Sequence, residues 1–185
     1  MPVFLTSSDA DFEQSFTALL GAKREDSPDV DAIVADIIAD VRHRGDAALL
    51  ELTEKFDRLA LKDANALRIS AKEVDAAIAT VSDAERSALE LAANRIRAYH
   101  AEQMPENKTW TDASGATLGW RWSAVSAAGL YVPGGLASYP SSVLMNAIPA
   151  KVAGVERLAV TVPTPDGQIN PLVLLACRIS GVDEI

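Results

Sequence analysis

The order of apolar runs and helical patterns after residue 129 constrains this chain more than any other feature. A strand-like run from Leu130 is followed by a loop, a helical pattern, the run RLAVTVP, the loop TPDG, the helical pattern NPLVLLACRISG and a further run, VDEI. This alternation is typical of parallel strands joined by crossover helices. The sequence therefore predicts an α/β fold that ends in an incomplete parallel sheet.

The preceding part of the chain, residues 8–104, shows helical patterns instead. Ser70 with Glu73, and Ser82 with Glu85, have the spacing of capping boxes and predict two helix starts. We expect a helical amino-terminal part ahead of the sheet.

Glycine and proline mark further helix limits in this part. Helix ends are predicted at Gly21 and Gly45, and a polar linker is predicted around Pro28. Between them an apolar stripe at helical spacing predicts an amphipathic helix, with Val30, Ile33, Val34, Ile37, Ile38 and Val41 on one face.

The pattern changes after Pro105. TWTDASGATLGWRW alternates apolar and polar residues around the turn sequence ASG, which predicts a β-hairpin, and a further strand follows it. The chain then stops at GVDEI, just as a strand begins, so we expect it to be a truncated piece of a longer protein.

Bulk properties exclude several classes of function. The net charge of −9, without a basic patch, argues against nucleic-acid binding. The apolar runs are too short to span a membrane, and the first residues do not resemble a secretory signal. A single cysteine cannot form an internal disulfide, so a cytoplasmic location is expected.

The loop YVPGGLASYPSS is the first candidate site, because it follows a strand's carboxyl end, where α/β sheets bind ligands. Ser141 and Ser142 have the chemistry to cap the next helix, and Tyr131 and Tyr139 offer flat faces and hydroxyl groups. A purely structural turn explains the same residues, and both interpretations stay open.

Three other features have simpler explanations. VTVPTPDG also ends a strand and can line the same crevice, but a plain connection is favoured. Pro149 is expected to kink the next helix or to mark where it restarts. Cys177 lies on the apolar side of its helix and is expected to be a small core residue.

No catalytic centre or metal site is predicted from the residues alone. His43 and His100 each lie late in a predicted helix, without a second His or Cys at the spacing of metal ligands.

A resemblance then enters at GLYVPGGLASYPSSVLMNAIPAKVAGVERLAVTVPTPDG, residues 129–167. This stretch resembles the histidinol dehydrogenase family, and so do DVRHRGDAALLELTEKFD and GWRWSAVSAAGLYVPGG. The resemblance covers most of the chain.

The resemblance implies a zinc- and NAD-dependent enzyme that oxidises L-histidinol through the aldehyde to L-histidine, the last step of histidine biosynthesis. It implies a homodimer with two incomplete Rossmann-like domains. For this chain we expect an amino-terminal helical arm over 1–25, the first α/β domain over 26–129 and the start of a second, Rossmann-like domain over 130–185.

Few residue roles carry over. Tyr131 matches the family's nucleotide-contacting tyrosine, and Pro133, Gly134 and Gly135 shape the loop beside it. The zinc ligands and the acid–base residues of the family are expected in a later part, beyond this chain. The piece is therefore expected to be inactive alone. A stand-alone nucleotide-binding or regulatory module, and an inert truncation product, are the alternatives.

Overall fold

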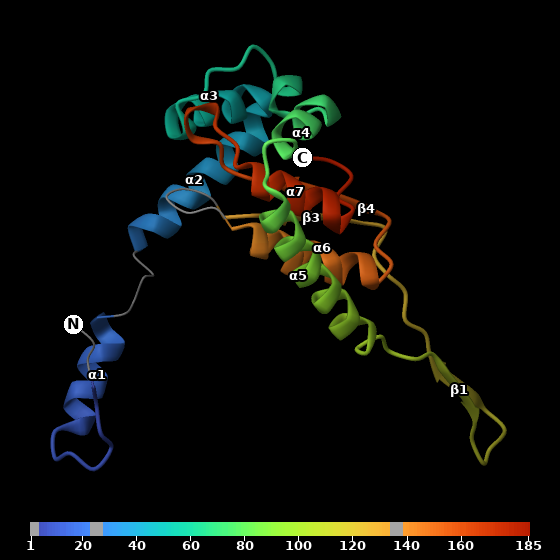
Figure 1. The fold of residues 1–185 in the computed structure, drawn as a ribbon. Coiled ribbons are helices and arrows are strands. Elements are labelled where there is room, and N and C mark those ends of the chain that lie inside the picture. Colours follow the sequence, from blue (N-terminus) through green and yellow to red (C-terminus); the bar gives the residue numbers. More distant parts are fainter. Residues whose placement is uncertain (1–3, 23–27, 134–138) are drawn as a thin grey trace. The chain divides into compact units, whose positions relative to one another are not determined.

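The computed structural model describes residues 4–22, 28–133 and 139–185 (Figure 1). The chain forms two compact units, residues 1–48 and residues 49–185. The family resemblance implies other limits, at residues 25 and 129, and these domain limits stay a prediction. No helix in the described part of the chain combines the length and apolar character needed to cross a membrane.

The first unit contains the helices α1 (Phe12–Ala22) and α2 (Pro28–Arg44). α1 continues through Gly21 to Ala22, so the helix end predicted at this glycine is wrong by one residue. The end predicted at Gly45 is confirmed, since this residue has a φ of +58° and its N–H donates to the Val41 carbonyl at 2.8 Å. Most of the predicted linker, residues 23–27, lies outside the described residues. The linker predicted around Pro28 is wrong at this residue, because Pro28 begins α2, and proline is well suited to the first helical position.

The helix α3 (Asp46–Asp57) leads into the second unit, where η1 (Ala64–Leu67), α4 (Ala71–Ile78) and α5 (Asp83–Ala101) follow. Both predicted capping boxes are confirmed. The Ser82 hydroxyl accepts the Glu85 N–H at 3.3 Å, and the Glu85 carboxylate accepts the Ser82 N–H at 3.1 Å. These contacts satisfy N–H groups that the first turn of a helix otherwise leaves unpaired.

The predicted hairpin is also confirmed, with β1 (Lys108–Thr111) and β2 (Thr117–Trp120) antiparallel. Its turn is held by Asp112, whose carboxylate accepts the N–H groups of Ser114 at 2.8 Å and Ala116 at 3.0 Å. Gly115 has a φ of +88°, a conformation that glycine adopts without steric cost.

A parallel sheet follows, as the sequence predicts. β3 (Ala127–Tyr131) and β4 (Arg157–Thr161) are parallel, and α6 (Pro140–Val152) connects them as a crossover helix. η2 (Pro165–Gly167) and α7 (Pro171–Ser180) then lead to the predicted third strand. That strand is reduced to one parallel bridge, Ala159 with Glu184. The structure is therefore the expected α/β fold with a partial sheet.

The core of the second unit lies where α5, α6 and α7 pack against one another and α6 packs against β3, as Figure 1 shows. α6 runs through Pro149 without restarting. Each large aliphatic side chain buried in this way contributes about 1.5–3 kcal/mol to stability. The buried residues include Val143, Leu144, Ala147, Ile148, Leu158, Val160, Val173, Ala176 and Cys177. The core fixes the helix that follows Tyr131, and so it fixes both sides of the candidate loop.

Candidate functional site

Two strand ends meet at the carboxyl edge of the parallel sheet. Tyr131 ends β3 and pairs in register with Thr161, which ends β4. The Val132 N–H donates to the Thr161 carbonyl at 2.9 Å, which holds the ends of the two strands together beyond the last pair. The loops YVPGG and VTVPTPDG therefore both start from one edge. Gly134 and Gly135 lie outside the described residues.

A cavity of about 520 Å³ opens at this edge. Tyr131 and the segment 160–164 line one side of it. The sequence favours a plain connection for VTVPTPDG, but this segment borders the same cavity as Tyr131. The rest of the wall comes from α3, from α4 and from loop segments. These residues are Leu49, Thr53, Asp57, Leu59, Leu61, Ala66, Leu67, Arg68, Ile69, Glu73, Gly167, Ile169 and Ile185.

The lining is largely aliphatic, with a few polar groups. Tyr131 is 68% exposed, so its ring and hydroxyl group are accessible. The aliphatic part consists of Leu49, Leu59, Leu61, Leu67, Ile69, Val160, Val162, Ile169 and Ile185. An apolar wall with few polar groups and one aromatic ring suits a flat, mainly uncharged part of a ligand.

The carboxylates in the wall come from Asp57 and Glu73. The Ser70 hydroxyl and the Ser70 N–H donate to Glu73 at 2.6 and 2.7 Å, and these bonds hold the pKa of Glu73 below its usual value. Glu73 is therefore ionised at neutral pH. A negative charge here opposes a phosphate group beside it and is compatible with ribose hydroxyl groups, which donate to carboxylates.

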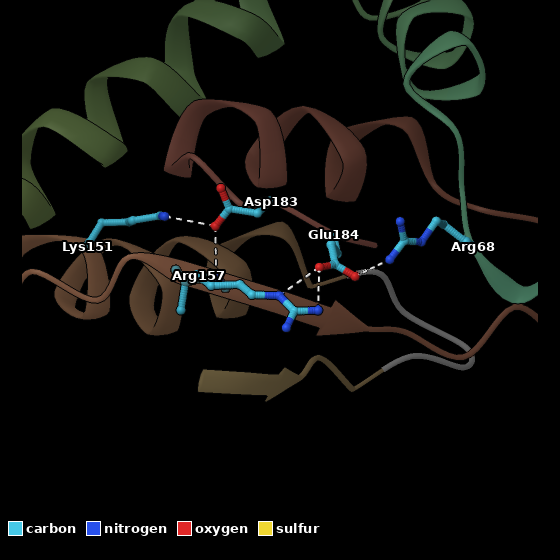
Figure 2. Close-up of polar contacts among 6 residues, drawn as sticks. Arg68, Lys151, Arg157, Asp183 and Glu184 are labelled. Carbon is cyan, nitrogen blue, oxygen red and sulfur yellow. Dashed lines mark hydrogen bonds and ion pairs between the residues drawn. The ribbon is translucent and has the colours of Figure 1, made fainter. Parts of the chain in front are cut away.

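Acidic residues near Ile185 make the polar contacts drawn in Figure 2. Asp183 accepts the Leu158 N–H at 2.7 Å and the Lys151 ammonium at 2.9 Å, and these contacts lower the pKa of Asp183. The neighbouring Glu184 pairs with Arg157 and with Arg68.

The next residue, Ile185, lies in the cavity wall. Its carbonyl accepts the Ile69 N–H at 2.9 Å, and Ile69 is also a wall residue. Polar contacts around the third strand thus set the position of two apolar side chains in the cavity.

The predicted cap of α6 is wrong. Ser141 and Ser142 lie inside the first turn, and the N-cap residue is Tyr139, whose side chain makes no capping hydrogen bond. Pro140 explains the difference, since proline is well suited to the first helical position and starts the helix one residue before Ser141.

The described histidines and the cysteine do not form a site. His43 lies in the last turn of α2, and His100 lies in the last turn of α5 with its Nδ1 2.6 Å from Gln103 Oε1. Among residues 4–22, 28–133 and 139–185 there is no group of three His, Cys, Asp or Glu side chains arranged to hold a metal ion. Cys177 is a buried core residue, as predicted, and burial raises the pKa of its thiol to about 12.

Comparison with known proteins assigns the family. The sequence profile of histidinol dehydrogenase matches residues 21–185. The chain belongs to the histidinol dehydrogenase family. It is 74% identical over all 185 residues to the histidinol dehydrogenase of Ruegeria pomeroyi and 69% identical to that of Cereibacter sphaeroides, and it spans 42% of the length of each.

A solved structure supports the family's fold for this chain. The crystal structure of histidinol dehydrogenase from Elizabethkingia anophelis matches 85% of the chain with a TM-score of 0.75 and 33% sequence identity. The match covers 36% of that protein. The described residues thus correspond to less than half of a histidinol dehydrogenase.

The cavity wall that faces the sheet edge does not follow from any local sequence pattern. Residues in this wall and beside it contact partners about 100 residues away in the sequence. Leu59 lies beside Gly167, Arg58 pairs with Asp166, and the Ile69 N–H donates to the Ile185 carbonyl. The signal available was local, namely the PDG turn, because aspartate and glycine tolerate a left-handed backbone.

Proposed function

We propose that this chain forms part of an enzyme that oxidises L-histidinol through the aldehyde to L-histidine with NAD. The identity of 74% to a histidinol dehydrogenase along the whole chain carries the proposal. Oxidation of an alcohol to a carboxylate removes four electrons, and the nicotinamide ring of NAD accepts a hydride in each two-electron step. Two molecules of NAD are therefore consumed for each histidinol.

Tyr131 is proposed to contact the nucleotide. The support is its place at the carboxyl end of β3, its accessible ring and the cavity of about 520 Å³ beside it. This volume suits one ring-and-ribose part of a dinucleotide, and the aliphatic wall suits a flat ring. Asp57 and Glu73 are proposed to accept ribose hydroxyl groups, with the phosphates bound away from these two carboxylates, since both carboxylates line the cavity.

Zinc does not fit the described residues. Their His, Cys, Asp and Glu side chains form no group of three around a common point, and Cys177 is buried with a pKa of about 12, whereas zinc binds the thiolate. No catalytic step is therefore assigned to zinc at these residues, and its ligands are proposed to come from other parts of the complete enzyme.

The complete enzyme is proposed to be a cytoplasmic homodimer, as the family resemblance implies. The 185 residues alone are proposed to be inactive, because the chain spans 42% of its relatives' length.

The test is an assay of NADH formation with histidinol, run on a protein of the family's full length that carries these residues. We expect histidinol-dependent reduction of NAD with two NADH per histidinol consumed, and no turnover by the 185-residue chain. A full-length protein that binds NAD without oxidising histidinol would instead indicate a nucleotide-binding module.

A further inference from the structure

Two surface loops of the second unit are joined by one ion pair. Arg58 follows α3, and Asp166 lies in η2, 108 residues later in the chain. The guanidinium donates from Nε to Oδ1 and from Nη2 to Oδ2, each at 2.7 Å, so the pair is bidentate. A bidentate pair fixes orientation as well as distance.

The backbone at both residues is unusual. Arg58 has a φ of 55° and Asp166 a φ of 57°, and they are the only non-glycine residues with positive φ in the described part of the chain. A left-handed backbone is sterically unfavourable for a non-glycine residue, because its Cβ lies too close to the following carbonyl oxygen. Such residues persist where the surrounding structure requires them, and they concentrate at functional sites.

Stability alone does not account for this arrangement. The side chains are 62% and 56% exposed, and exposed ion pairs contribute little to folding because water and salt screen them. The geometric effect of the pair is therefore more informative than its energy.

The residues that flank the pair also meet, and they line the cavity beside Tyr131. The Thr164 N–H donates to the Asp57 carboxylate at 3.4 Å. Leu59 lies so close to Gly167 that a Cβ at this glycine would be 3.3 Å from Leu59 Cδ1. Asp57, Leu59, Thr164 and Gly167 are all wall residues.

The three consecutive residues Asp57, Arg58 and Leu59, at the end of α3 and just after it, thus contact the connection between β4 and α7. The outer two contacts border the cavity, and the central ion pair faces solvent. Separating Arg58 from Asp166 would allow these two walls to move apart.

We propose that Arg58 and Asp166 are positioning residues that hold these two cavity walls together and so set the affinity for NAD. This inference rests on the proposed function, because it takes the cavity as part of the nucleotide site. Neither Arg58 nor Asp166 lines the cavity, so the pair acts through its neighbours in the wall, Asp57, Leu59, Thr164 and Gly167.

The test compares Arg58→Ala, Asp166→Ala and the double variant in the full-length enzyme. We expect each single variant to raise the dissociation constant for NAD, measured by calorimetry, by about 3- to 10-fold. The Michaelis constant for NAD should rise in parallel, with kcat and the constant for histidinol unchanged. The double variant should resemble a single one, because each change already breaks the pair.

Two further variants separate positioning from general stability. Arg178→Ala breaks an exposed ion pair with Asp75 that joins α7 to α4 outside this cavity, and it should leave NAD affinity unchanged. The exchange Arg58→Asp with Asp166→Arg should recover part of the affinity. Amide hydrogen exchange at Thr164 should accelerate in the single variants, since their walls separate.

The outcomes are distinct. Unchanged NAD affinity in Asp166→Ala, or equal weakening in Arg178→Ala, would overturn the positioning role while histidinol oxidation by the parent enzyme still supports the proposed function. A parent enzyme that neither binds NAD nor oxidises histidinol would overturn both.

Discussion

At the scale of single residues, Tyr131 combines exposure with a fixed backbone. Its β-strand pairing with Thr161 holds the main chain, while its side chain lies in the cavity wall. A tyrosine in this position can stack on a ring or donate a hydrogen bond, and either interaction is worth roughly 0.5–1.5 kcal/mol. In the full-length enzyme, Tyr131→Ala should raise the Michaelis constant for NAD by about 2- to 12-fold, and Tyr131→Phe by less.

The control for this prediction is Tyr139→Ala, which removes a second partly exposed tyrosine that is absent from the cavity wall. It should leave the Michaelis constant for NAD near that of the parent. If Tyr131→Ala lowers the melting temperature and leaves the constant for NAD unchanged, Tyr131 has a packing role only.

At the scale of elements, the start of α5 depends on one reciprocal cap. Ser82→Ala removes the acceptor of the Glu85 N–H and should lower the free energy of unfolding by about 1 kcal/mol in urea titrations. Ser87→Ala, the same change at an exposed position inside α5, should have little effect. Equal losses in both variants would mean that the hydroxyl at residue 82 has no capping role.

The same cap is linked to pH. The Ser82 hydroxyl and then the Ser82 N–H lower the pKa of Glu85 below its ordinary value of 4.5. Because the folded-state pKa is the lower one, the stabilisation is complete above pH 4.5 and is lost as the pH falls through the folded value. Glu85→Gln should therefore make stability less dependent on pH in this acidic range, while Glu90→Gln, without this cap, should not. A Glu85→Gln curve parallel to the parent's would contradict this linkage.

The sequence predicts an element well when the residues that determine it are close together along the chain. The caps at Ser70 and Ser82, the hairpin turn at Gly115 and the β3–α6–β4 unit follow from neighbouring residues, and all were predicted. The cap of α6 was mispredicted because Pro140, one residue away, offered a competing helix start.

The cavity cannot be predicted from neighbouring residues. The place of Tyr131 at a strand end was predicted, but the opposite wall depends on Arg58 meeting Asp166 and Ile69 meeting Ile185. These contacts span more than 100 residues, and no local pattern specifies which distant loops will approach each other.

At the scale of the whole molecule, the question is where a metal ion of this family would be held. The chain has two histidines and one cysteine. His43 and His100 belong to the separate units 1–48 and 49–185, and Cys177 is buried with a thiol pKa of about 12.

Because structural and catalytic zinc sites need three or four converging ligands, the purified 185-residue chain should hold no stoichiometric zinc. Atomic absorption after dialysis measures this directly, and added zinc should leave the melting temperature unchanged, since only an ion bound to the folded state raises it. The full-length enzyme, treated in the same way, is the positive control and should retain zinc. Near-equimolar zinc in the 185-residue chain that is lost in both His43→Ala and His100→Ala would show that these residues do form a metal site.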